Sequence, residues 1–217
     1  MYRFCRDHFL HTMTSPFGTT YNPFSIAHSL SLLIGDEEIH EDDIFFHKGL
    51  YRHFAFHSLA AKTDKEEFIR TALQMIRTGS SFLKKTTVLV ITFGTAFGYF
   101  HKKTGKVVNN CHTLSAGEFT RELIPLRDMV TSCTEVLSTI KKQNPGLFII
   151  FTLSPVRHLR DRADENSLSK AVLRCAIHEL LSLPDTWYFP AYEIILDELR
   201  DYRYYKEDLC HPGETAV

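Results

Sequence analysis

Asp208 and His211, three residues apart near the C-terminus, are the side chains whose types and spacing point most directly to chemistry. In a loop, this spacing allows the carboxylate to hold the imidazole in one tautomer while the second ring nitrogen faces a pocket. A carboxylate and an imidazole arranged in this way form the acid–base half of a nucleophilic hydrolase site. Asp-x-x-His also occurs by chance on exposed loops. The interpretation therefore requires a sheet that carries the loop and a nucleophile from which the imidazole can take a proton.

Residues 87–93 form an apolar, β-branched run that ends in a glycine turn. Such a run is typical of a strand buried on both faces of a parallel sheet. Gly94 and Thr95 follow it, and ligands of open α/β sheets bind at the carboxyl ends of strands. A glycine there allows close approach of the backbone and leaves amide N–H groups for an oxyanion. The alternative is a turn that leads into a hairpin through residues 104–105, and the two interpretations are compatible.

A second buried strand is predicted at residues 147–153, and it too is followed by polar residues. Ser154 comes directly after it, and Arg157 and His158 lie a few positions further on. Two basic side chains at a strand end suit an anionic ligand. Ser154 is interpreted first as the hydroxyl of a Ser-Pro turn and second as a candidate nucleophile.

Two further groups of residues could contribute polar chemistry. Asn110 and His112 end an extended run that starts at Val107, and either side chain could contact a substrate; a plain loop is the alternative. His53 and His57 stand four residues apart, as two metal ligands do on one helical face. The surrounding segment alternates aromatic and polar residues, which favours an extended strand, so we expect no metal at this pair.

The elements that must position these residues are those of one α/β domain spanning residues 1–217. Buried strands separated by amphipathic helices are the pattern of β-α-β units. Polar and aromatic residues in short alternation at 36–63 predict a small insertion, with a helical turn near residues 41–45 and a hairpin around residues 48–49. Helices are expected at residues 23–34, 64–79, 126–144, 166–183 and 192–199, and a third strand at residues 186–189.

Composition argues against several classes of protein. Hydrophobic residues make up 44% of the 217 residues, enough for a substantial core, and the net charge of -1 does not suggest a nucleic-acid or membrane-surface partner. No apolar run approaches the ~20 residues of a membrane span. The five widely spaced cysteines include no C-x-x-C pair, which indicates neither a disulfide framework nor a zinc knuckle and favours a reducing cytoplasm.

Several motifs, in order along the chain, resemble the GSCFA family from about residue 15 onward. That family looks like a branch of the SGNH (GDSL-like) hydrolases, and its members are mostly bacterial. The resemblance implies a flavodoxin-like, three-layer parallel sheet with helices on both faces, and hydrolysis of acyl or O-acetyl esters without a cofactor. The motifs lie at residues 15–18, 21–23, 94–96, 110–112, 154–158, 166–167, 169–170, 188–190, 197–203 and 208–212.

The resemblance also assigns roles. The Asp-x-x-His block of SGNH hydrolases matches Asp208 and His211, which implies that His211 is the general base and Asp208 its orienting partner. The turn at 94–95 matches the block that supplies an oxyanion-hole donor. That block carries an asparagine where this chain has Ala96, and Asn110 is the candidate substitute.

One block of the family is not recognisable in this chain. The Gly-Ser-Cys-Phe-Ala block with the nucleophilic serine should precede the motif at Pro16, but none of the residues before Pro16 reads Gly-Ser-Cys. A closing helix should also follow the final block, so we expect the chain to be truncated at both ends. Without its serine the usual mechanism should fail. Cys5, Cys111 and Cys210 are alternative nucleophiles, although the last two adjoin histidines in sequence and neighbours in extended chain point apart.

Two functions are favoured by these observations, and a third class, a metal-dependent hydrolase that uses His53, His57 and another histidine, is less favoured. The first is an SGNH-like serine esterase or deacetylase for a small-molecule or glycan ester, inactive if its serine is absent. The second is a non-catalytic α/β binding module for a polar or anionic ligand. Its pocket would be lined by Asn110, His112, Arg157 and His158.

Overall fold

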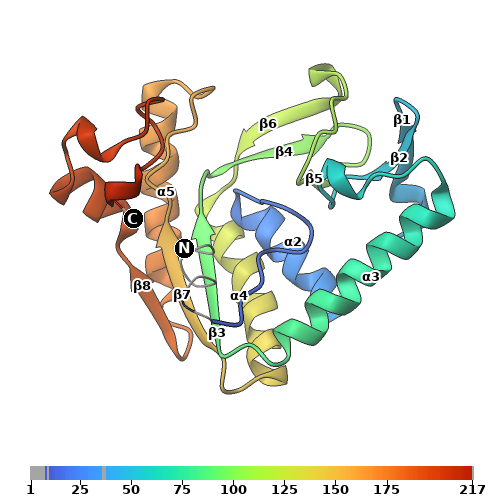
Figure 1. Ribbon diagram of the computed structural model, residues 1–217, viewed down its shortest axis with the longest axis horizontal. Helices are drawn as coiled ribbons and strands as arrows, with labels where there is room; N and C mark the ends of the chain where they lie inside the picture. Colours follow the sequence, from blue (N-terminus) through green and yellow to red (C-terminus); the bar gives the residue numbers. More distant parts are fainter. Residues whose placement is uncertain (1–7, 9, 36–37, 217) are drawn as a thin grey trace.

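The protein contains a parallel sheet of three strands, in a computed structural model that describes residues 8, 10–35 and 38–216 (Figure 1). The strands are β3 (Val88–Phe93), β7 (Phe148–Leu153) and β8 (Thr186–Phe189), in the order β3-β7-β8. Both pairings are parallel, so the carboxyl ends of all three strands meet at one edge of the sheet. The mixed α/β class and the three predicted strands are confirmed.

The helices form close to where the sequence predicts them, and local caps fix the ends of the first. The side-chain oxygen of Asn22 accepts the N–H of Ser25, and Pro23 occupies the first helical position. Gly35 ends this helix in the left-handed conformation, at φ 79°. The helices are α2 (Pro23–Ile34), α3 (Lys65–Leu83), α4 (Leu126–Gln143), α5 (Ala163–Leu180) and α6 (Ala191–Glu193), which continues as a π-helical turn at Ile194–Glu198.

α3 continues to Leu83, past the end predicted at Gly79. A Cβ atom on Gly79 would lie 2.6 Å from Leu33 Cδ2 and 2.8 Å from Pro16 Cγ. Glycine is therefore present because α2 and the segment before it pack closely against α3, and the predicted boundary is wrong.

α5 begins at Ala163, before the cap predicted at Asn166 or Ser167, and that prediction is wrong. The carboxylate of Glu165 accepts the N–H of Arg162 at 3.0 Å, which satisfies one of the free N–H groups at the start of the helix. Asn166 therefore lies inside the helix, where its side chain is available for other contacts.

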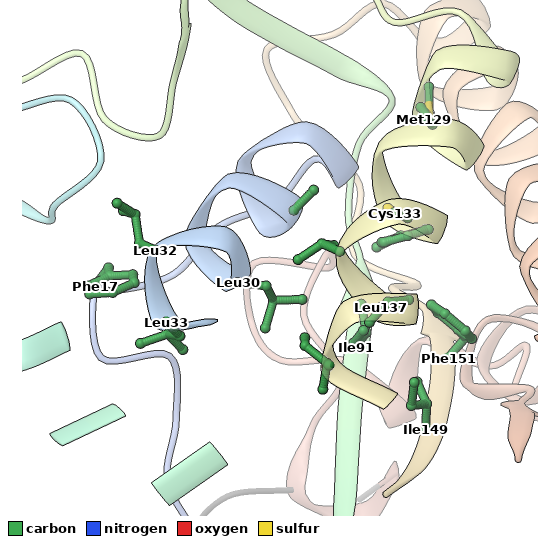
Figure 2. Packing of buried hydrophobic residues seen from close by; sticks show 14 of the residues in the cluster. Phe17, Leu30, Leu32, Leu33, Ile91, Met129, Cys133, Leu137, Ile149 and Phe151 are labelled. Atoms are coloured by element: carbon green, nitrogen blue, oxygen red, sulfur yellow. The ribbon is translucent and has the colours of Figure 1, made fainter. Parts of the chain in front are cut away.

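Helices cover one face of the parallel sheet. Leu137 of α4 packs beside Ile91 of β3 and Phe151 of β7, and all three side chains are buried (Figure 2). On the opposite face, Val88 is 46% exposed and Trp187 is 65% exposed. The prediction that the first strand is buried on both faces is therefore wrong, and a three-layer arrangement is not confirmed within the described residues. A run of apolar residues indicates a strand, but it does not say what covers each face.

Two antiparallel units lie outside the parallel sheet: one above α2 in the view of Figure 1, and one further to the right, above α3. In the first, with strand order β5-β4-β6, the glycine turn predicted at residues 104–105 joins β4 to β5. The second is the hairpin predicted around residues 48–49, whose turn residues Lys48 and Gly49 have φ values of 49° and 76°. The strands are β4 (Phe97–His101), β5 (Val107–Val108), β6 (Phe119–Leu123), β1 (Ile44–His47) and β2 (Leu50–His53), and a 3-10 turn at Glu41–Asp43 precedes β1.

Candidate functional site

Asp208 and His211 are in direct contact. His211 Nδ1 lies 2.6 Å from Asp208 Oδ2, and Asp208 Oδ1 accepts the backbone N–H groups of His211 and Cys210 at 2.9 Å each. These N–H groups, the one from His211 first, lower the pKa of Asp208 to about 2. The carboxylate is therefore ionised near neutral pH and can only accept, which places the proton of the shared hydrogen bond on Nδ1. In the neutral ring the lone pair is then on Nε2, which forms no hydrogen bond within the described residues.

A small closed loop presents this pair. Tyr205 forms an isolated β-bridge with Pro212, and Gly213 donates its N–H to the carbonyl oxygen of Tyr204 at 2.7 Å. Leu209 lies in the left-handed region at φ 53°, a conformation that bends the chain sharply between the two bridged ends. The spacing of the acid and the imidazole is thus fixed by backbone hydrogen bonds as well as by their own contact.

Cys210 ties this loop to the parallel sheet. The residue is 3% exposed, and its thiol donates to the carbonyl oxygen of Arg157 at 3.2 Å. Arg157 belongs to the segment that follows β7, and its side chain is exposed. Asp208 and His211 therefore lie near the carboxyl ends of the strands, where the C-terminal segment is drawn in red in Figure 1 and where ligand sites of parallel sheets form.

The turn after β3 is occupied by a neighbouring segment. The carbonyl oxygen of Tyr21 accepts the N–H groups of Gly94 at 2.8 Å and Thr95 at 3.1 Å. The third amide of the turn, that of Ala96, donates to the hydroxyl of Ser169 at 2.7 Å. The predicted oxyanion donors are thus in place at a strand end, but an oxyanion could reach the first two only if the Tyr21 carbonyl moved away.

Ser154 has the contacts of a turn residue. Its hydroxyl accepts the N–H of Val156 at 3.3 Å, which matches the first interpretation of this serine. Its carbonyl oxygen accepts a hydrogen bond from Lys170 Nζ at 2.8 Å, and the same ammonium donates to the carbonyl oxygen of Gly94 at 2.6 Å. Burial lowers the pKa of Lys170 to about 8. Sequence reasoning did not place Lys170 in the site, although a lysine among inward-facing residues of a helix is a recognisable signal.

His158 lies next to this lysine and is half-buried. Its ring meets the ring of Tyr21 edge to face, with 5.6 Å between the centroids. Burial is the main cause of the lowered pKa of His158, and the charge of Lys170 lowers it further. His158 is therefore a neutral imidazole at neutral pH, and only Arg157 of the two predicted anion-binding side chains carries a full positive charge there.

Asn110 and His112 lie elsewhere. Asn110 donates its N–H to the carbonyl oxygen of Phe54, and its side-chain oxygen accepts the N–H of His112. His112 is 2% exposed, and its Nε2 lies 2.8 Å from the carbonyl oxygen of His53 at the end of β2. β2 and the C-terminal segment lie at opposite sides of the molecule, so the structure does not bring these residues to Asp208 (Figure 1). The expected pocket shared with Arg157 is not formed.

His53 and His57 make local contacts. His53 Nδ1 accepts the N–H of Ala55 at 3.0 Å, and His57 Nδ1 accepts the N–H of Leu59 at 3.2 Å. His53 ends β2, as the extended interpretation predicts. Within the described part of the chain, no group of three or more His, Cys, Asp or Glu side chains could hold a metal ion.

None of the alternative nucleophiles that the structure describes is directed at His211. The thiol of Cys210 donates to Arg157, away from the adjacent imidazole. Cys111 is half-buried and its pKa is raised by that burial, which disfavours the reactive thiolate. Cys5 lies outside the described residues.

A shallow groove of about 660 Å³ borders the acid of the pair. Its lining mixes both charges with aromatic surface, which suits a polar ligand better than an apolar one. The lining includes Arg203, Tyr205, Lys206, Asp208 and Glu214.

The fold and the site together define a mixed α/β protein with an aspartate–histidine pair near the carboxyl ends of parallel strands. The chain belongs to the GSCFA family, because the family model matches residues 1–217, and the resemblance stated above is confirmed. No curated protein and no solved structure matches the chain. No helix in the described part of the chain has the length and apolar character needed to cross a membrane.

Proposed function

We propose that this GSCFA chain belongs to the SGNH type of ester hydrolase, in which His211 is the general base and Asp208 orients it. The substrate class is an acyl or O-acetyl ester on a small molecule or glycan, and no cofactor takes part. Family membership and the parallel order of β3, β7 and β8 support the placement in that superfamily.

The observation that carries the proposal is the contact between His211 Nδ1 and Asp208 Oδ2 at 2.6 Å, made by a ring that is 54% exposed. This contact fixes the tautomer in which Nε2 is the proton acceptor. The ring can then take a proton from an attacking hydroxyl as that oxygen adds to the ester carbonyl carbon. When the ester C–O bond breaks, the imidazolium returns the proton to the leaving alkoxide, while Asp208 stabilises the positive ring.

The attacking hydroxyl is that of a serine in the SGNH scheme or that of water. Within the described residues, no serine, threonine or cysteine donates a hydrogen bond to His211. With water as nucleophile, His211 would act as a general base alone, and the acceleration would be at the lower end of the ~100- to 10,000-fold typical of such catalysis.

Hydrolysis of p-nitrophenyl acetate and of an O-acetylated sugar tests the proposal. His211→Ala should abolish hydrolysis, and Asp208→Asn should reduce it by roughly 1,000-fold or more when a serine acts, because the amide holds the ring in the wrong tautomer. His178→Ala removes an exposed imidazole from α5 and serves as the matched control with unchanged rate. Full activity in His211→Ala would exclude His211 as the base.

A second candidate function, a non-catalytic binding module, is favoured by one observation. The amide groups of Gly94 and Thr95 both donate to the Tyr21 carbonyl, which leaves no free oxyanion donor there. Such a module would bind a polar or anionic ligand through Arg157 and His158, without Asn110. It predicts no hydrolysis by the wild-type chain on either ester, together with saturable shifts of the Arg157 and His158 signals in NMR titrations with acetate or phosphate.

A further inference from the structure

One polar stripe on α5 faces the carboxyl ends of β3 and β7. Its residues stand at positions i, i+3 and i+4, which share one side of a helix. Two of them are only 1% and 2% exposed, although serine and lysine are seldom buried so completely. The stripe consists of Asn166, Ser169 and Lys170.

Lys170 joins the two strand ends. Its ammonium donates to the carbonyl oxygen of Gly94, which follows β3, at 2.6 Å and to that of Ser154, which follows β7, at 2.8 Å. A buried cation is tolerated only with such partners. These partners are 76 and 16 residues away along the chain, so one side chain bridges both turns. It adds to the backbone hydrogen bond from Ser154 N–H to the carbonyl oxygen of Phe93 at 2.9 Å.

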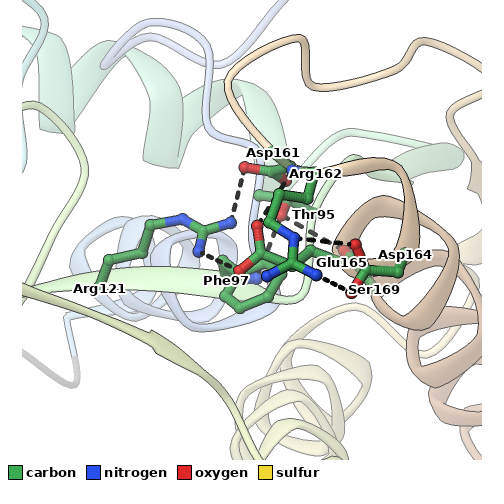
Figure 3. A network of polar contacts seen from close by, with 8 residues as sticks. All are labelled: Thr95, Phe97, Arg121, Asp161, Arg162, Asp164, Glu165 and Ser169. Atoms are coloured by element: carbon green, nitrogen blue, oxygen red, sulfur yellow. Dashed lines mark hydrogen bonds and ion pairs between the residues drawn. The ribbon is translucent and has the colours of Figure 1, made fainter.

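Ser169 holds the turn after β3. Its hydroxyl oxygen accepts the N–H of Ala96 at 2.7 Å and lies 3.4 Å from Thr95 Oγ1, a contact drawn in Figure 3. The Tyr21 carbonyl oxygen accepts the N–H groups of Gly94 and Thr95. With the Ser169 hydroxyl as acceptor for Ala96, three consecutive amides of the turn are hydrogen-bonded. The backbone of the turn is thereby held in one conformation.

Asn166 and Lys170 both contact the segment that follows β7. The side-chain oxygen of Asn166 accepts the N–H of His158 at 3.4 Å. The imidazole of His158 is kept neutral by burial and by the positive charges of Lys170 and Arg121, while Asp161 acts in the opposite sense. A neutral ring can both donate and accept a hydrogen bond, whereas an imidazolium can only donate.

Ion pairs fix the helix that carries the stripe. Arg121 of β6 lies 2.6 Å from Asp161 and 3.4 Å from Glu165, and its guanidinium stacks 3.6 Å from the ring centroid of Phe97 (Figure 3). The Asp161 side chain is only 7% exposed, so solvent screens this pair much less than a surface pair. The first turn of α5 is therefore held against β4 and β6.

We propose that Ser169 and Lys170 are positioning residues of the site at the strand ends, because they lock the turns after β3 and β7 together. Neither side chain touches substrate. This inference rests on the proposed function only where it concerns turnover, because the geometry of the turns and the state of His158 are properties of the free protein.

Lys170→Met, with Arg174→Met as matched control, tests the inference. Arg174 is also a cation of α5, and its ion pair with Glu193 lies outside the site. In Lys170→Met, the NMR titration of His158 should move to higher pH than in the wild type, and kcat for p-nitrophenyl acetate should fall by ~10-fold or more with a small change in KM, since small displacements of positioned groups are costly. Arg174→Met should change neither the titration nor kcat.

Ser169→Ala tests the role of Ser169 separately from that of Lys170. It also serves as the test if Lys170→Met does not fold. It removes the acceptor of the Ala96 N–H without a change of charge. Hydrogen exchange at Ala96 should accelerate by ~10-fold or more, in line with a lost buried hydrogen bond, while the His158 titration stays as in the wild type. Unchanged exchange at Ala96 would overturn the role of Ser169.

Two results distinguish failure of the inference from failure of the proposed function. If the wild type hydrolyses no ester, the proposed function fails, while the His158 titration and the Ala96 exchange still decide the inference. If the wild type is active and Lys170→Met has the same kcat and the same His158 titration, the positioning role of Lys170 is wrong and the proposed function stands.

Discussion

The thiol of Cys210 lies 3.2 Å from the carbonyl oxygen of Arg157, although the two residues are 53 positions apart in the sequence. Cys210 directly precedes His211, so this contact couples the position of the imidazole to the segment after β7. The loop is otherwise closed mainly on itself, through the bridge between Tyr205 and Pro212. A cysteine that sequence reasoning considered as a nucleophile is thus an anchor.

Cys210→Ala should loosen this anchor, and Cys210→Ser should largely retain it, because serine can still donate to the Arg157 carbonyl. The alanine variant leaves that carbonyl without its donor, at a cost of about 1–2 kcal/mol in the free energy of unfolding. Chemical denaturation and hydrogen exchange at the His211 amide measure the two effects. Cys175→Ala, at an exposed position of α5, is the control. Equal exchange at His211 in wild type and Cys210→Ala would contradict the anchoring role.

Mild acid should destabilise the region around β2. His53 is 6% exposed, and its pKa is lowered from 6.5 to about 4, mainly by burial, with Asp43 opposing and His28, Lys106 and His112 adding to the shift. The unfolded chain therefore binds a proton near pH 6.5 that the folded chain takes up only near pH 4. Stability is full above about pH 6.5 and falls as the pH drops towards 4, by up to ~3 kcal/mol from this group.

Urea unfolding of wild type and His53→Asn at pH 7 and pH 4.5 tests this expectation. The asparagine oxygen can still accept the Ala55 N–H, and the variant cannot be protonated there. It should be less stable at pH 7, since the ring contact with Phe56 is lost, but its loss of stability between the two pH values should be smaller than in the wild type. His178→Asn should leave the pH dependence unchanged. An equal pH dependence in wild type and His53→Asn would rule out His53 as its source.

Trp187 should report the uncovered face of the parallel sheet. It is the only tryptophan of the chain and is 65% exposed, in register with Ile150 of β7 and, across β7, with Val90 of β3. Its fluorescence should be that of a water-exposed indole and should be quenched readily by iodide. Val90→Lys should change the free energy of unfolding by less than ~0.5 kcal/mol, as at other surface positions. Short-wavelength emission with protection from iodide would mean that this face is covered.

Sequence reasoning succeeded for the elements whose signals are local. The strands β3 and β7 follow from continuous apolar runs, and α2 follows from the cap at Asn22 and the stop at Gly35. It failed in two places for different reasons. α5 starts early because Glu165 accepts the N–H of Arg162, a local capping signal that the prediction overlooked. The exposed face at Val88 depends on which other segments pack against the sheet, and no pattern within a single segment carries that information.

In the candidate site, too, the contacts between residues close in sequence could be predicted, whereas those with distant segments could not. The contact of Asp208 with His211 follows from their spacing, and the structure has it at 2.6 Å, while the catalytic role stays a prediction. The position of Asn110 at the end of an extended run predicts a place in the site, yet the hydrogen bond of its N–H to the carbonyl oxygen of Phe54 places it beside β2. Lys170 was missed because its two carbonyl partners lie in other parts of the sequence.

Gly79→Ala should destabilise the protein, against the usual effect of this substitution within a helix. Alanine in a helix is normally favoured over glycine by about 1 kcal/mol. Here the added Cβ would lie 2.6 Å from Leu33 Cδ2 and 2.8 Å from Pro16 Cγ, and the proline ring cannot rotate away. Overpacking of this kind typically costs about 1–3 kcal/mol, so the net change in the free energy of unfolding should be a loss.

The matched control is Gly146→Ala. A Cβ at Gly146 would meet nothing within 4 Å, and its φ is not positive, so alanine should be neutral or slightly stabilising there by restricting the unfolded chain. Urea unfolding of both variants gives the comparison. If Gly79→Ala were as stable as Gly146→Ala, α3 would not be packed against Pro16 and Leu33 as closely as described. Close packing would then not explain the glycine at this position.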